Sequence, residues 1–323
     1  MGDSAFLIGI DGGGSKTAVV LTDASLSPLF VEYYPRSNPG DIGAEPAISL
    51  ITDSCRAFCE KHGVSPARVR ALFAGIAGGS AGNFAQMLIA SLSAAFPDTL
   101  CGVSDDGTNV LYASFPDRDG VSIICGTGSA CFVKKDAAVY RIGGFGQFDL
   151  KGNGFEIGRA AFSHVFRVLD GRDSAGWLSD EINRRFGGSA YREIMSINAY
   201  GKNEFAKFAP LVFEAASEHG DANAMRILTE QLSHISDLIV SAKRFFPDGP
   251  YEVALSGGIT KHPLTLRILQ EHLPEDVRLF RAEREPYIGA AAKARALLSG
   301  DAPVVLPRFL PTDEKPVLHP FLP

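Results

Sequence analysis

Short apolar runs alternate along the chain with segments in which apolar residues recur at helical spacing. Two runs, at 6–12 and 17–23, flank three glycines and predict a β-hairpin, because glycine permits a tight turn and valine favours extended chain. Further elements are then expected in this order: strand 28–34, helix 45–62, strand 70–76, helix 82–96, strand 100–104 and helix 107–114. The first half of the chain therefore predicts a three-stranded meander followed by alternating helices and strands.

The same order begins again near residue 120. Strand 120–125 runs into a second glycine turn, the chain leaves through ACFVKK, and a third strand is expected at 139–142. Helices are then predicted at 153–170, 174–186, 203–218, 221–246, 262–272 and 287–298, and strands at 251–256 and 277–281. This repetition predicts an α/β protein with an internal duplication of architecture. The proline-rich segment 301–323 has no clear periodicity and is expected to be an extended arm.

Composition narrows the class of protein. A chain of 323 residues is long enough for two domains, each with its own core, and its apolar fraction of 46% is typical of a globular protein. The net charge of −6 leaves no basic stripe for a nucleic acid or an anionic membrane. The N-terminal apolar run is too short for a signal peptide or a membrane span. We therefore expect a cytoplasmic protein without either kind of partner, and leave a homodimer open.

The five cysteines are odd in number, and none stands in a C-x-x-C pair. Cys55 and Cys59 are one helical turn apart, with His62 nearby. These three residues leave a metal site as an alternative, but small residues of a helix core are the interpretation we favour. The cysteines thus predict a reduced protein.

The first glycine turn carries the clearest chemistry in the sequence. Asp11 ends the first strand, and the turn that follows is Gly12, Gly13, Gly14, Ser15, Lys16 and Thr17. Backbone N–H groups of such a turn can bind phosphate, and an aspartate at its mouth can hold a divalent metal. A P-loop is excluded because Ser15 separates Gly14 from Lys16, and a dinucleotide-binding turn is excluded because a strand follows instead of a helix. The alternative is an ordinary glycine hairpin.

Several such motifs, in order and each at a strand end, resemble one superfamily. IGIDGGGSKT resembles the first phosphate motif of the actin-like ATPases and sugar kinases, SIICGTGSACF the second, and ALSGGI at 254–259 the adenosine motif. GGFGQ at 143–147 and the helical stretch 208–224 are similar to segments of N-acetylglucosamine kinases in the BadF/BadG/BcrA/BcrD ATPase family. The resemblance implies two ribonuclease H-like domains, each a mixed sheet with flanking helices, at 1–115 and 116–300, with a cleft between them.

The resemblance also implies a nucleotide site that uses ATP and Mg²⁺. Asp11 would hold the metal, through water, and residues 12–17 would surround the β- and γ-phosphates. Lys16 would add positive charge, with a solvated strand lysine as the alternative. The remaining nucleotide contacts are expected from Gly126, Thr127, Gly128, Ser129, Ala215, Gly257 and Gly258. Gly289 and Ala290 resemble the small pair at the hinge between the domains.

For the acceptor sugar, Asp105 is the expected catalytic base. It follows directly on a strand, where residues at a sheet end meet ligands, and it matches the family's proton-accepting aspartate. Asp106 is the competing aspartate, and either residue at this boundary could instead cap the next helix. The other sugar contacts implied are Asn38, Gly78, Gly79, Gly144, Phe145, Gly146 and Asp149. For Asn38, a turn residue before Pro39 is the alternative.

One departure from the family pattern concerns the sugar. The amino-sugar kinases continue with Gly-Asp-Glu-Gly-Ser-Gly, whereas this chain has FDLKGNG at 148–154. Either Asp149 takes the place of the sugar-binding aspartate, or Lys151 reverses the local charge and favours an acidic sugar. The expected activity is ATP-dependent phosphorylation of an N-acetylglucosamine or glucosamine type sugar at a primary hydroxyl.

Three alternatives to this activity remain open. The first is a kinase of another hexose or a muramic-type sugar, and the second is a regulator of the same fold without kinase activity. The third, an activator of a radical enzyme with an iron–sulfur cluster, needs paired cysteines that Cys125 and Cys131 do not supply.

Overall fold

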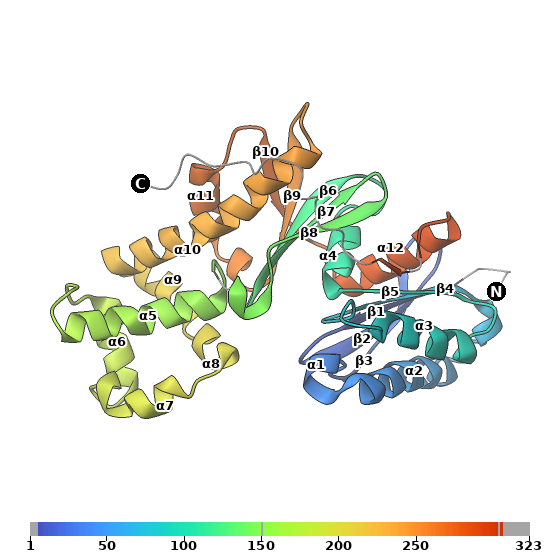
Figure 1. Cartoon of the computed structure of the whole chain (residues 1–323), viewed down its shortest axis with the longest axis horizontal. Helices are drawn as coiled ribbons and strands as arrows, with labels where there is room; N and C mark the ends of the chain where they lie inside the picture. Colours follow the sequence, from blue (N-terminus) through green and yellow to red (C-terminus); the bar gives the residue numbers. More distant parts are fainter. Residues whose placement is uncertain (1–5, 150, 303, 306–323) are drawn as a thin grey trace. The chain divides into compact units, whose positions relative to one another are not determined.

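The computed structural model describes residues 6–149, 151–302 and 304–305 (Figure 1). Contacts within the chain divide it into two compact units. As far as they are described, residues 1–122, 132–141 and 282–323 form the first unit, and residues 123–131 and 142–281 form the second. Both units are therefore discontinuous in sequence, because the chain passes from one to the other inside neighbouring strands.

The first sheet has the strand order β11-β5-β4-β1-β2-β3. Strands β1 to β3 form an antiparallel meander, and β4, β5 and β11 add in parallel beside β1. The bounds are β1 (Phe6–Gly12), β2 (Lys16–Thr22), β3 (Pro28–Pro35), β4 (Val69–Ile76), β5 (Leu100–Ser104) and β11 (Val304–Val305). This mixed sheet confirms the predicted hairpin meander. The rest of the predicted C-terminal arm, residue 303 and residues 306–323, lies outside the described residues.

The second sheet repeats this order as β10-β9-β6-β7-β8. Its strands are β6 (Gly120–Cys125), β7 (Ser129–Lys135), β8 (Ala138–Ile142), β9 (Tyr251–Ser256) and β10 (Val277–Arg281). In both sheets three consecutive strands lie side by side, and the next two strands add beside the first of the three. The internal duplication predicted from the sequence is thus confirmed.

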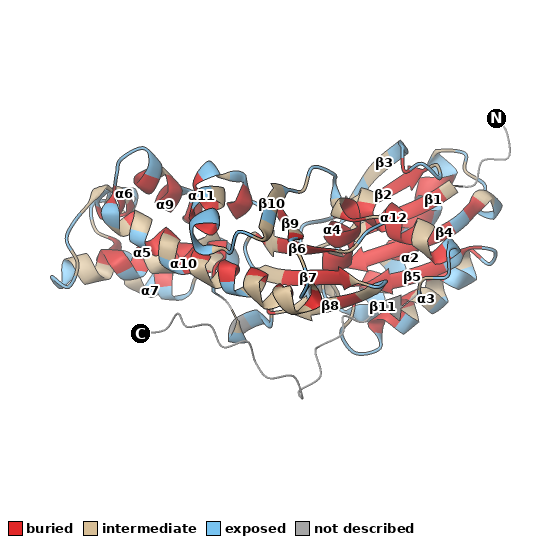
Figure 2. Ribbon diagram, turned by 90° about the horizontal axis from the view of Figure 1, so that it is seen from above, coloured by how far each residue is buried: buried red, intermediate tan, exposed pale blue. Residues whose placement is uncertain are grey.

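Alternation along β1 explains why a glycine stands between two isoleucines. Ile8 and Ile10 are fully buried in a core that includes residues of α2 (Ala44–Lys61) and α3 (Phe84–Ala95). Gly9 faces α12 (Pro286–Leu298) instead, where an added Cβ would lie 2.4 Å from a backbone carbonyl oxygen. Helix α4 (Asp106–Ser114) packs beside α12. Figure 2 shows that β2, β4 and β5 are buried along most of their length, whereas the edge strand β3 is not.

The helices differ from the prediction in three places, two of them in the second unit and one in the first. The predicted helix 203–218 is two helices, because Pro210 lacks an N–H group and stands in the first turn of a new helix. Helix α7 and the single turn α1 were not predicted, since so few residues show no periodicity. The bounds are α1 (Pro39–Ile42), α5 (Gly154–Leu169), α6 (Trp177–Arg185), α7 (Ile194–Asn198), α8 (Lys202–Ala206), α9 (Ala209–Ser217), α10 (Ala222–Ser241) and α11 (Pro263–His272).

Two composition-based expectations can be compared with the structure. Cys55 and Cys59 are buried in the first core, as expected for small core residues, and the ring of His62 stacks on Phe30. No helix in the described part of the chain is both long and apolar enough to cross a membrane.

Candidate active site

The first glycine turn joins β1 to β2 at the edge of the first unit. Gly14, Ser15 and Lys16 are exposed there, and the Lys16 Nζ lies 3.9 Å from the centre of the Tyr33 ring. The charge of Lys16 also lowers the pKa of Asp11, and its contact with a phosphate stays a prediction. The buried Thr17 hydroxyl lies 2.8 Å from both the Pro35 carbonyl oxygen and the Ser37 hydroxyl, so it anchors the loop after β3.

Asp11 lies at the mouth of this turn in acidic surroundings. Its pKa is raised to about 6: burial has the largest effect and the charges of Asp106 and Glu285 add to it, whereas a hydrogen bond from Asn109 and the charge of Lys16 lower it. A buried carboxylate with other carboxylates near it is the kind of oxygen ligand that a divalent cation favours. The donor chemistry at Asp11 therefore fits Mg²⁺.

Asn109, on α4, was not foreseen from the sequence. Its fully buried amide nitrogen lies 2.8 Å from Asp11 Oδ1, 3.2 Å from the Ile10 carbonyl oxygen and 3.1 Å from that of Gly75. An added Cβ at Gly75 would overlap this amide, at 2.1 Å from its oxygen. One side chain thus joins α4 to both parallel strands and fixes the carboxylate of Asp11.

Asp105 and Asp106 separate into different roles. Asp105 stands at the N-cap position of α4, but its side chain makes no capping hydrogen bond to the helix. Instead its carboxylate accepts hydrogen bonds from the Ser80 N–H at 3.0 Å and the Ser80 hydroxyl at 2.7 Å. Asp106 accepts from the Gly107 N–H, and burial, followed by the charge of Asp105, raises the pKa of Asp106 to about 6. The buried Asp105 is therefore held by a loop and not by the helix.

The structure brings the other predicted sugar contacts of the first unit to the same loop. Gly79 precedes Ser80 and lies so close to β5 that an added Cβ would be 2.5 Å from the Ser104 carbonyl oxygen. Gly78 adopts a φ of +77°, and an added Cβ there would be 3.4 Å from Asn38 Oδ1. That oxygen accepts from the Gly40 N–H at 2.8 Å and so caps α1. Asn38 thus caps its own turn, and its contact with the sugar stays a prediction.

The predicted sugar segment of the second unit is built from glycines in left-handed conformations. Gly143, Gly144 and Gly146 have φ values of +68°, +77° and +66°, which disfavour other residues. The Phe145 side chain is half exposed. Asp149 Oδ2 accepts a hydrogen bond from the Gly144 N–H at 2.7 Å. This bond joins the two ends of the loop from residue 144 to residue 149. Lys151 is exposed.

The second glycine turn is tied to the start of α5. The Gly154 N–H donates to the Gly126 carbonyl oxygen at 2.7 Å, and the Phe155 N–H donates to that of Thr127 at 3.2 Å. The Ser129 hydroxyl donates to the Lys151 carbonyl oxygen at 3.0 Å, and Gly128 closes the turn by accepting from the Gly126 N–H. Asn153 Oδ1 accepts from the Glu156 N–H at 3.1 Å, so the first N–H groups of α5 are all paired and hold the turn in place.

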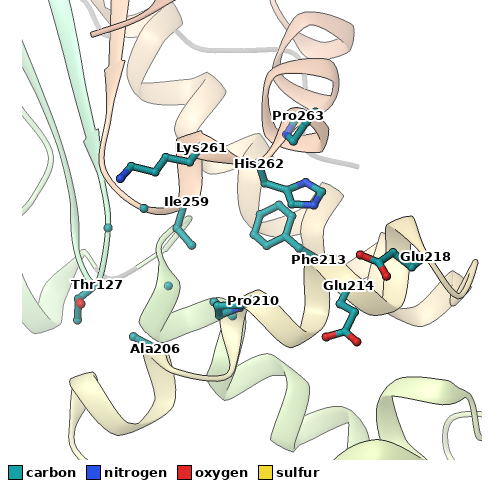
Figure 3. A pocket seen from close by; sticks show the side chains of 14 residues that line it. Thr127, Ala206, Pro210, Phe213, Glu214, Glu218, Ile259, Lys261, His262 and Pro263 are labelled. Carbon is teal, nitrogen blue, oxygen red and sulfur yellow. The ribbon is translucent and has the colours of Figure 1, made fainter. Parts of the chain in front are cut away.

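A pocket of about 820 Å³ opens beside this turn, within the second unit (Figure 3). Phe213 and His262 face each other across 4.7 Å between ring centres, and Glu214 and Glu218 lie on the same helical stretch. His262 Nδ1 accepts from the Leu264 N–H, and burial lowers its pKa, so the neutral ring keeps an Nε2–H donor. The pocket is lined by Gly126, Thr127, Gly154, Ala206, Ala209, Pro210, Phe213, Glu214, Glu218, Gly258, Ile259, Lys261, His262 and Pro263.

Only part of the predicted adenosine site lines this pocket. Gly258 does so, whereas Ala215 is fully buried and its neighbours Phe213 and Glu214 line the pocket instead. Gly257 has a φ of +102°, and an added Cβ would lie 2.3 Å from the Cys125 carbonyl oxygen, so it joins β9 closely to β6. Phe213 lies in the stretch 208–224 that resembles the family, whereas His262 lies outside the motifs that the sequence offered.

Two sheets of the same strand order, each with a glycine turn after its first strand, define a nucleotide-binding α/β protein of the actin-like ATPase class. The profile of the BadF/BadG/BcrA/BcrD ATPase family matches residues 8–294, and the chain belongs to this family.

Individual relatives are distant but span most of the chain. An N-acetylmuramic acid/N-acetylglucosamine kinase of Clostridium acetobutylicum is 25% identical over 70% of this chain and 75% of its own length. A glucosamine kinase of Vibrio cholerae is 23% identical over 79% of this chain and 85% of its own length. The solved structure of a candidate N-acetylglucosamine kinase from Chromobacterium violaceum has a TM-score of 0.67 at 22% identity, over 90% of this chain and 99% of that protein. The structural likeness shows the fold.

Proposed function

We propose that this protein transfers the γ-phosphoryl group of ATP to a primary hydroxyl of an amino sugar of the N-acetylglucosamine or glucosamine type. The observation that carries the proposal is the position of the buried Asp105, which directly follows β5 and is held by two hydrogen bonds from Ser80. Asp105 belongs to the same unit as the glycine turn that follows Asp11. Family membership and the names of the relatives support the same reaction class.

In this reaction Asp105 accepts the proton of the sugar hydroxyl while the sugar oxygen forms a bond to the γ-phosphorus. The bond from that phosphorus to the bridging oxygen breaks, and ADP leaves. The glycine turn at residues 12–17 of the first unit binds phosphate through backbone N–H groups, and residues 126–129 of the second unit stay a predicted phosphate contact. Asp11 is the residue that would hold Mg²⁺, and the ion supplies positive charge to the polyphosphate when bound. Asn109 keeps the Asp11 carboxylate in one orientation.

The nucleoside of ATP is assigned to the pocket that contains Phe213 and His262. Truncating Phe213 to alanine is expected to weaken binding of a non-hydrolysable ATP analogue by about tenfold or more, because aromatic stacking on a base is typically worth about 1–3 kcal/mol. Isothermal titration calorimetry measures the change. Tyr191→Ala, which removes an exposed ring of the same unit, is the matched control. An unchanged affinity in Phe213→Ala would place the nucleoside elsewhere.

The altered segment 148–154 bears on which sugar is accepted. Because Asp149 already bonds to Gly144, we expect a lower kcat/KM for N-acetylglucosamine than in a kinase with the usual Asp-Glu pair. Glucosamine, a muramic-type sugar or another hexose is then the alternative preferred sugar. The loss of one buried carboxylate contact costs roughly 1–3 kcal/mol, or about one to two decades in specificity.

ADP release with N-acetylglucosamine, glucosamine, N-acetylmuramic acid and glucose, followed by location of the phosphate in the product, tests both the activity and the preference. A clear preference for N-acetylglucosamine that is lost in Asp149→Ala and kept in Lys151→Ala contradicts the expected order. Release of no ADP with any sugar would contradict the kinase itself and favour a nucleotide-binding regulator.

A further inference from the structure

The carboxylate of Asp105 has a second neighbour besides Ser80. Arg141, on β8, places its Nη1 3.7 Å from Asp105 Oδ2. Asp105 Oδ1 accepts from the Ser80 N–H, and Oδ2 accepts from the Ser80 hydroxyl while facing the guanidinium. Both oxygens are therefore oriented, and each keeps a lone pair for another donor. Arg141 lies in the first unit and stands two residues before the glycine segment that begins at Gly143.

The position of Arg141 is built into the β7–β8 hairpin. The turn of this hairpin has left-handed residues at Asp136 and Ala137, and the Asp136 N–H donates to Asp119 at 3.1 Å. The guanidinium of Arg141 lies over the ring of Phe132, 5.8 Å from its centre. That ring contacts the first turn of α4 closely, since a Cβ added to Gly107 would lie 2.1 Å from it. The hairpin thus places the guanidinium of Arg141 beside the first turn of α4.

The charges around this place explain why a cation is needed. Asp105 and Asp106 are adjacent, and the pKa of Asp106 is raised by burial and by Asp105 but lowered by Arg141. Asp106 in turn raises the pKa of Asp11, from β1. Buried carboxylates that repel one another require a positive partner. Lys16 lies over Tyr33 and lowers the pKa of Asp11, whereas Arg141 is the cation beside Asp105.

We propose that Arg141 is a positioning residue for phosphoryl transfer, which together with Ser80 holds the carboxylate of Asp105 toward the acceptor hydroxyl. The inference rests on the proposed function. Arg141 acts through Asp105: the proton still passes from the sugar hydroxyl to Asp105, and the new and broken bonds are those of the reaction above. The guanidinium opposes the negative charge of both carboxylates and supports the orientation of Asp105 that the Ser80 hydrogen bonds set.

The test compares Arg141→Ala with Arg141→Lys, Ser80→Ala and the unchanged protein. Because misplacing a reacting group by about 1 Å can cost about 100-fold, we expect kcat to fall by about 10- to 100-fold in Arg141→Ala. The Kd of a non-hydrolysable ATP analogue should change less than about twofold, because the nucleoside pocket belongs to the second unit. Arg141→Lys should recover part of kcat, and Ser80→Ala should lose about tenfold.

Two further measurements separate positioning from a general loss of structure. Guanidinium, at concentrations far below those that unfold proteins, should restore part of kcat to Arg141→Ala, since Arg141 is partly exposed and the vacated space admits the ion. It should restore nothing to Asp105→Asn. Arg70→Ala, which removes an exposed arginine from β4, is the matched control and should keep full activity.

The outcomes distinguish the inference from the function on which it rests. An active protein whose Arg141→Ala variant keeps kcat within about twofold contradicts only the role of Arg141. A loss of kcat with a lowered melting temperature, no recovery in Arg141→Lys and no rescue by guanidinium indicates a structural role and also overturns it. If the unchanged protein shows no sugar-dependent ADP release, the proposed function and the inference fail together.

Discussion

Replacing Asp105 with asparagine is expected to lower sugar-dependent ADP release by about 10²–10⁴-fold, the range typical for loss of a general base. Asparagine has nearly the same shape, so its oxygen can still accept the hydrogen bond from the Ser80 N–H that now holds Asp105. It cannot accept the proton of the sugar hydroxyl at neutral pH. Binding of an ATP analogue should therefore stay close to that of the unchanged protein, as calorimetry can measure.

The control for this variant is Asp98→Asn, which removes an exposed carboxylate just before β5 and should leave turnover unchanged. Near-normal turnover in Asp105→Asn would show that another group accepts the proton. In that case Asp106→Asn identifies whether the neighbouring aspartate is the base, since both stand at the same strand end.

Gly289→Ala is expected to destabilise the first unit strongly. A Cβ at this position would lie 1.8 Å from the Asn109 carbonyl oxygen and 2.5 Å from the Ala113 nitrogen, both in the backbone of α4. Because a helix backbone cannot move aside as a side chain can, α12 must shift away from α4. Overpacking of this kind typically costs about 1–3 kcal/mol, and we expect the upper part of that range.

Thermal unfolding measures this effect, and a fall in melting temperature of about 4 °C or more is expected. Gly249→Ala is the matched control, since an added Cβ there meets no atom within 4 Å and its φ is not positive. A melting temperature that is unchanged in Gly289→Ala would contradict the close packing of α12 on α4.

The elements that the sequence predicted well are those with a repeated pattern. The hairpin meander, the duplicated strand order and most long helices follow from apolar periods that extend over many residues. The break before Pro210 was missed because apolar spacing continues across it, and α1 was missed because four residues contain no period. Local pattern thus determines long elements, whereas single turns depend on hydrogen bonds such as the one Asn38 accepts from Gly40.

The candidate site was predicted where a motif contains the functional residue. Asp11 and Asp105 stand at strand ends beside recognisable turns, so sequence alone identified them. Their partners were not found, because Asn109 is 98 positions from Asp11, and Ser80 is 25 positions from Asp105. Such contacts are created by strand order and helix packing, which place distant segments side by side.

The return of α12 to the first sheet has a consequence for how the protein is made. Helix α12 packs against β1 through Gly9, although the two elements stand near opposite ends of the described chain. During synthesis β1 to β5 leave the ribosome early. They lack their contact with α12 until residues 142–281 have also been synthesised. The second unit can therefore complete its core first, and the first unit, which contains Asp11 and Asp105, closes only when α12 has emerged.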